Sequence, residues 1–168
     1  MRRSIALNSA SLIIALCLAA LAPPASAAGM LQTFEPASLQ QIVQQHKGKP
    51  FMLFIWSLDC TYCQTTLDVL AQVKRDDKGL TIVTLSTDAA DDPQAAALME
   101  KRLTELKMQQ NAWAFGPASP DKIKYAIDPK WFGEKPRTYW FNARGERIAY
   151  SGTLTPEKIK SLQQRTAK

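Results

Sequence analysis

The sequence predicts an α/β fold in which helices flank a mixed central β-sheet. Two observations carry this prediction. Strand-like apolar runs alternate along the chain with amphipathic helical patterns, and a hairpin turn alone separates the last two such runs. Strands connected through helices pair in parallel, whereas a hairpin adds an antiparallel strand. The 168 residues contain no repeat and no linker, so we expect one folded domain.

The first half of the domain has clear local signals. Ser38 can cap a helix, and Pro50 precedes a continuous apolar run typical of a buried parallel strand. Gly79 ends the next helical pattern and precedes a β-rich run. The expected elements, after a short apolar stretch at 30–34, are a helix at 38–46, a strand at 51–56, a helix at 60–75 and a strand at 80–85.

The second half continues the alternation and then closes the sheet. Asp91, Asp92 and Pro93 place acids and a proline where a helix begins. The segment 142–145 is a strong hairpin turn signal. The expected elements are a helix ending near 107, a short strand at 111–115, a helix at 119–127, strands at 137–141 and 146–150, and a final helix from 155.

The N-terminus predicts export. Two arginines precede an uncharged apolar run at 5–21, and small residues then form an A-x-A pattern. We expect a signal peptide over 1–27 and a mature domain over 28–168, with cleavage after Ala28 as the close alternative. A retained membrane anchor is the other alternative. The apolar run is short for a span, which needs about 20 apolar residues. We therefore expect a periplasmic protein with no stable membrane insertion after cleavage.

The distribution of charge argues against a nucleic-acid-binding protein. Removal of the two N-terminal arginines lowers the formal net charge from +6 to +4, and the remaining basic residues are interleaved with acids. Nucleic-acid binding needs a concentrated basic face, so we expect no nucleic-acid partner.

The cysteines of the mature chain predict redox chemistry. Only Cys60 and Cys63 remain there, because Cys17 lies in the predicted signal peptide. A bond between residues three apart closes a tiny loop and removes little unfolded-state entropy, so stability alone is a poor reason for the pair. The pair follows a strand and opens a helix, where unpaired N–H groups favour a thiolate on the first cysteine. Cys60 is the expected nucleophile, and Cys63 the resolving cysteine.

Three other interpretations of the cysteine pair compete with redox chemistry. A structural zinc site needs about four ligands, and only His46 could join the two cysteines. Copper(I) can bind two thiolates, but no methionine cluster or neighbouring histidine supports it. An inert disulfide fits the strand–CxxC–helix context poorly. We therefore expect no metal, and no cofactor beyond the redox-active disulfide.

Two motifs carry a resemblance to a known family. The segment 54–63, FIWSLDCTYC, is similar to F-W-A-x-W-C-x-x-C, and the segment 134–145, EKPRTYWFNARG, is similar to G-x-P-x-T-F-x-x-D-x-x-G. Both are patterns of exported thioredoxin-like reductases of the TlpA/ResA/CcmG type. The resemblance covers nearly all of the mature chain. It implies a thioredoxin-like fold with a central insertion, formed by the helix at 93–107 and the strand that contains Trp113.

The resemblance also implies roles for residues outside the cysteine pair. Pro136 is expected to be cis and to face the cysteines, and the backbone of Lys135 to pair with an extended substrate segment. Thr61 and Tyr62 are expected to contact the substrate. Trp56 and Tyr139 could join Tyr62 in an apolar surface for a protein substrate, or could instead belong to the core.

Departures from the family pattern bear on the direction of electron flow. Asp59 replaces the tryptophan that usually precedes the first cysteine, and Phe54 stands where thioredoxin has a buried aspartate. Arg137 follows the proline where cytochrome c maturation reductases tend to have glutamate. A nearby Asp59 should raise the pKa of Cys60, whereas Arg137 and the helix dipole should lower it. The sequence alone does not rank these effects.

The expected function is thiol–disulfide exchange with protein substrates. By resemblance we favour a reductase, for example in cytochrome c maturation or related thiol maintenance, supplied with electrons by a membrane partner of the DsbD/CcdA type. The alternatives are a disulfide oxidase or isomerase, and a metal-binding thiol module.

Overall fold

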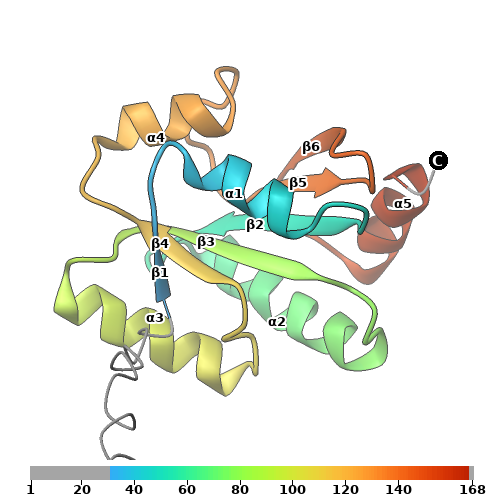
Figure 1. Ribbon diagram of the computed structural model, residues 1–168. Coiled ribbons are helices and arrows are strands. Elements are labelled where there is room, and N and C mark those ends of the chain that lie inside the picture. Colours follow the sequence, from blue (N-terminus) through green and yellow to red (C-terminus); the bar gives the residue numbers. More distant parts are fainter. Residues whose placement is uncertain (1–30, 167–168) are drawn as a thin grey trace, which may run out of the picture.

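The computed structural model describes residues 31–166, which form one six-stranded sheet with helices on both faces (Figure 1). The strands are β1 Leu31–Phe34, β2 Phe51–Trp56, β3 Ile82–Ala89, β4 Ala112–Phe115, β5 Arg137–Phe141 and β6 Arg147–Ser151. The helices are α1 Ser38–Gln45, α2 Thr61–Asp76, α3 Pro93–Glu105, α4 Pro120–Ile127 and α5 Pro156–Thr166.

The sheet is mixed, as the alternation of elements predicted. Its strand order is β1-β4-β3-β2-β5-β6. The first four strands in this order are parallel to one another, whereas β5 runs antiparallel to β2 and β6 antiparallel to β5. The helix and strand expected as a central insertion are α3 and β4.

Strand β2 runs through the centre of the domain and is buried along its whole length. Its side chains alternate between two cores, as a strand covered on both faces requires. Phe54 and Trp56 belong to the core on the face covered by α2, α3 and α5. Leu53 and Ile55 belong to the core beneath α1 and α4. The end of β2 therefore projects from the most buried part of the molecule.

The structure adds a strand that the sequence pattern did not predict. The apolar stretch before the first helix contains β1, which pairs in parallel with β4 at the edge of the sheet. Only Phe34 of this strand is fully buried. The four residues, LQTF, include two polar side chains and form no continuous apolar run. β3 also extends to Ala89, beyond the predicted end at 85.

The expected cap of the first helix is wrong by one residue. Ala37 occupies the N-cap position and offers no side-chain hydrogen bond. Ser38 instead accepts a hydrogen bond from the backbone N–H of Glu35 at 2.9 Å. The Ser38 hydroxyl thus stabilises the turn between β1 and α1 and does not cap the helix. Asp92 and Ser119 do cap their helices with their side chains.

The predicted signal peptide lies outside the described residues, and so does its cleavage site. Across 31–166, none of the helices combines the length and the apolar character needed to span a membrane.

A charged cluster joins α4 to β5. The carboxylate of Asp128 accepts a hydrogen bond from the Tyr139 hydroxyl at 3.1 Å and pairs with Arg137 at 3.3 Å. Arg147 approaches the same carboxylate at 3.9 Å. Burial alone would raise the pKa of Asp128, but hydrogen bonds from the backbone of Lys130 and from Tyr139, with the two arginines, hold it below its ordinary value.

Replacement of Asp128 should destabilise the fold in a pH-dependent way. For Asp128→Asn we expect the free energy of unfolding at neutral pH to fall by about 1–3 kcal/mol, because the mostly buried Arg137 loses one of its two carboxylate partners. A carboxyl whose pKa is lowered by folding stabilises the protein above the pKa it has when unfolded. That contribution disappears as the pH falls through the folded-state pKa. The deficit should therefore shrink below about pH 4 in urea unfolding.

Asp121→Asn is the matched control, since Asp121 pairs with Lys124 on the surface with 90% of its side chain exposed. It should change the stability little at any pH. Equal losses in the two variants, or a loss for Asp128→Asn that persists unchanged in acid, would contradict the assignment.

Candidate redox site

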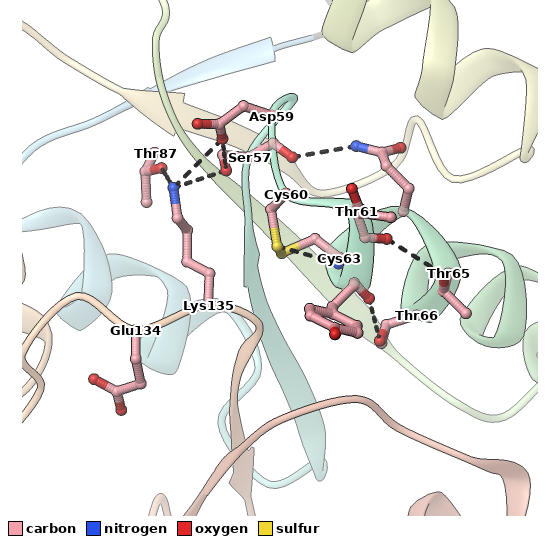
Figure 2. The surroundings of a disulfide bond; sticks show 12 residues. Ser57, Asp59, Cys60, Thr61, Cys63, Thr65, Thr66, Thr87, Glu134 and Lys135 are labelled. Carbon is pink, nitrogen blue, oxygen red and sulfur yellow. Dashed lines mark hydrogen bonds and ion pairs between the residues drawn. A yellow bond between two sulfur atoms is a disulfide. The ribbon is translucent and has the colours of Figure 1, made fainter.

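The cysteine pair lies where β2 gives way to α2 (Figure 2). Cys60 and Cys63 form a disulfide with their Cα atoms 5.1 Å apart. Cys60 occupies the N-cap of α2, and its sulfur accepts a hydrogen bond from the backbone N–H of Cys63 at 3.2 Å. The same N–H and the positive end of the helix dipole would face a thiolate on Cys60 after reduction.

The two sulfurs differ in their access to solvent. Cys60 is partly exposed, whereas Cys63 is fully buried in the core with Trp56 and Leu67. An incoming thiol or disulfide therefore reaches Cys60 first, and Cys63 can react only with a sulfur already bound to its neighbour. The nucleophilic role expected for Cys60 requires such exposure, and the resolving role expected for Cys63 is compatible with burial.

The loop that presents Cys60 is clamped by neighbouring elements. Asp88, at the end of β3, accepts a hydrogen bond from the backbone N–H of Leu58 at 2.9 Å. Gln64 of α2 donates to the carbonyl oxygen of Ser57 at 3.2 Å. Arg102 of α3 in turn donates to the Gln64 side chain at 3.0 Å. These contacts fix the backbone just before the nucleophile, which preorganises the site.

The turn before β5 approaches the same loop from the other side. The peptide bond between Lys135 and Pro136 is cis, and Pro136 is buried. The Lys135 ammonium donates to the Ser57 hydroxyl at 2.7 Å and to Thr87 at 3.2 Å (Figure 2). It also lies 3.8 Å from the Asp59 carboxylate. The sequence suggested a role only for the backbone of Lys135, because no local pattern reveals where its side chain reaches.

Asp59 lies on the surface next to this lysine, with 86% of its side chain exposed. The hydrogen bond from Ser57 and the charge of Lys135 lower its pKa, so it is a carboxylate at neutral pH. The structure thus places the opposite charges of Asp59 and Lys135 next to each other beside the cysteine loop.

Arg137 points away from the cysteines, contrary to the tuning role expected for it. Its guanidinium pairs with Glu134 at 2.9 Å and with Asp128, and it lies over the ring of Tyr139. Tyr139 belongs to the core on the α1 and α4 face, whereas Cys63 belongs to the core on the opposite face. Alternation along β5 is the cause, since residues 137 and 139 share one face of the strand.

The aromatic residues expected at the substrate surface separate into two groups. Tyr62, on the first turn of α2, is 69% exposed and is available to a partner. Trp56 and Tyr139 are completely buried, so the contact with substrate expected for Trp56 is wrong, and both rings belong to the core. Thr61 is exposed beside Cys60.

His46 and the cysteine pair lie at opposite ends of β2, so His46 does not join the cysteines in a metal site. Its ring packs on Phe51 at 4.8 Å between centroids, at the start of β2, whereas the cysteines follow the end of that strand. Partial burial and the charge of Lys49 lower its pKa. Within 31–166, no three histidine, cysteine, aspartate or glutamate side chains are grouped to hold a metal ion.

Comparison with known proteins relates the chain to others by structure alone. No family model and no curated protein matches the sequence. Among solved structures, a DsbF homologue from Corynebacterium diphtheriae has a TM-score of 0.58 at 15% identity, over 73% of this chain and 75% of that one. A secreted disulfide oxidoreductase of Mycobacterium tuberculosis, described as homologous to Escherichia coli DsbE, has a TM-score of 0.51 at 19% identity, over 74% and 84%.

A thioredoxin-like protein solved in its oxidised form is similar too, with a TM-score of 0.54 at 15% identity over 73% and 80% of the two chains. At identities this low, structural similarity establishes the fold alone. The thioredoxin-like fold implied by the two sequence motifs is therefore confirmed.

The clamp on the cysteine loop can be tested at Asp88. Asp88→Ala leaves the Leu58 N–H and the Ser86 hydroxyl without their acceptor. We expect the free energy of unfolding to fall by about 1–2 kcal/mol and the Leu58 amide to exchange its hydrogen faster. Urea unfolding and amide hydrogen exchange measure the two effects. Asp91→Ala, at an exposed position nearby, is the control. Unchanged exchange at Leu58 in the Asp88 variant would contradict the clamp.

Proposed function

We propose that this protein is a thiol–disulfide oxidoreductase that exchanges its Cys60–Cys63 disulfide with protein substrates. The observation that carries the proposal is the asymmetry of the pair. A partly exposed sulfur caps the start of a helix, and a fully buried sulfur lies one turn behind it. In this proposal the cysteine pair itself carries the two electrons, as a dithiol when reduced, and no separate cofactor takes part.

The exchange proceeds in two steps that balance in atoms and electrons. In the reducing direction the Cys60 thiolate attacks a substrate disulfide, a mixed disulfide forms, and one substrate sulfur leaves as a thiolate. Cys63, as its thiolate, then attacks the Cys60 sulfur, and the second substrate sulfur leaves. The substrate gains two electrons and, at neutral pH, two protons. The protein is left oxidised, as in this structure, and a dithiol donor must reduce it again.

A protein segment suits the surface around Cys60 better than a small thiol does. Tyr62 offers an exposed ring on one side of the sulfur, and Thr61 lies beside it. On the other side, the backbone of Lys135 before the buried Pro136 is the proposed docking edge for an extended chain. Main-chain hydrogen bonds of this kind give affinity without demanding one substrate sequence.

The compartment and the direction of the reaction are further parts of the proposal. The N-terminal pattern supports export to the periplasm, and one structurally similar protein is described as secreted. We favour the reducing direction, toward cytochrome c apoproteins or other periplasmic thiols, with a membrane electron donor of the DsbD/CcdA type. This preference rests on the sequence resemblance, by analogy.

Trapping of a mixed disulfide tests the proposed function. Cys63→Ser removes the sulfur that releases the substrate, so mixed disulfides through Cys60 should accumulate in cells. They should appear as higher-mass bands on a non-reducing gel and disappear when a reducing agent is added. Cys60→Ser, which keeps Cys63 buried, is the matched control and should trap far less. Equal trapping by the two variants would overturn the assigned roles, and no protein adduct at all would overturn the protein substrate.

The reduction potential tests the proposed direction. We expect a value well below about −180 mV, which is in the range of thioredoxin-like reductants rather than oxidants. Equilibration with glutathione buffers, followed by alkylation and mass spectrometry, measures it. A potential near −120 mV, as in strong oxidants, would favour the oxidase alternative. Tight copper(I) binding by the reduced pair without exchange activity would favour a metal-binding module.

A further inference from the structure

The side chain of Lys135 forms a bridge between segments far apart in the sequence. It leaves the turn before β5 and reaches the hydroxyls of Ser57 and Thr87, at the ends of β2 and β3 (Figure 2). Ser57 is 1% exposed, and its hydroxyl donates to the Asp59 carboxylate. A continuous polar chain thus runs from the lysine to the residue immediately before the nucleophilic cysteine.

The charges at this position are few and their partners are identified. Asp88, from β3, is bonded to the Leu58 N–H and the Ser86 hydroxyl. Glu134, next to the lysine, is paired with Arg137. The first turn of α2 contributes the phenol ring of Tyr62. Lys135 and Asp59 are therefore the two charged side chains that face each other across the loop leading to Cys60.

We propose that Lys135 and Asp59 are an opposed charge pair that sets how strongly the Cys60 thiolate is stabilised. Lys135 is a positioning and tuning residue whose positive charge favours the thiolate, and Asp59 offsets part of that effect. The inference rests on the proposed function. It assigns the lysine side chain a role in addition to that of its backbone.

The two charges differ in their contact with water. The Lys135 side chain is 25% exposed, whereas that of Asp59 is 86% exposed. Solvent and salt screen an exposed charge more than a partly buried one. The lysine should therefore have the larger influence on Cys60, and the pair as a whole should favour the thiolate.

Replacement of each partner should shift the ionisation of Cys60 in opposite directions. We expect Lys135→Met, which keeps an apolar stem, to raise the pH midpoint of Cys60 ionisation by about half a unit or more. Asp59→Asn should lower the midpoint by a smaller amount, and the double variant should lie between the two. The measurement is the rate of alkylation of Cys60 in the reduced protein as a function of pH, with the site identified by mass spectrometry.

Equilibrium with glutathione provides a second measurement. A shift of half a pH unit changes the stability of the thiolate about threefold. At a pH where the thiolate dominates, the disulfide of Lys135→Met should therefore be about threefold or more harder to reduce, and that of Asp59→Asn easier to reduce by a smaller factor.

Opposite signs separate a charge effect from a merely structural one. Loosening of the loop would move both single variants in the same direction, or would change the rates without moving the midpoint. Lys135→Arg should restore most of the parent behaviour, and Lys122→Met, at an exposed position on α4, should leave the midpoint unchanged. Shifts of the same sign, or no shift, would overturn the proposal. Because alkylation needs no substrate, this result is independent of whether a protein adduct is trapped.

Discussion

The whole site depends on the burial of β2. A strand covered on both faces is held rigidly, so the position of its C-terminal end is fixed. Only four residues lie between the end of β2 and the start of α2, so the cysteine at the N-cap of this helix cannot move without disturbing the core. The contacts from β3, α2 and the turn before β5 then need only to fix a very short loop. The reactive sulfur is positioned by packing first and by hydrogen bonds second.

Local sequence signals were sufficient for the elements that create this geometry. The apolar run of β2, the cysteines that open α2 and the turn between β5 and β6 are all read from short segments, and each is observed. β1 was missed because its pairing with β4 joins residues about 80 positions apart, and its four residues carry no period of their own. Edge strands of this kind are stabilised by tertiary contact rather than by local preference.

The site was predicted less completely than the fold, for a geometrical reason. Alternation along β5 places Arg137 and Tyr139 on the same face, and this could be read from the sequence. Which face carries the cysteines could not, so Arg137 was expected near Cys60 and lies elsewhere. The reach of Lys135 to Ser57 crosses 78 positions in the chain and has no sequence signature. Long-range side-chain contacts at the junction of three elements are the part that only a structure reveals.

The marginal strand β1 has a consequence for local unfolding. Two strands separate it from β2, and its removal would withdraw one buried ring, that of Phe34, from the core. The disulfide, the clamped loop and the cis-proline turn all lie next to the ends of the other strands, not next to β1. Opening at this edge should thus occur at a lower free energy than opening of the centre, as subglobal units of folded proteins do. The N-terminal edge of the domain can fluctuate while the redox centre stays assembled.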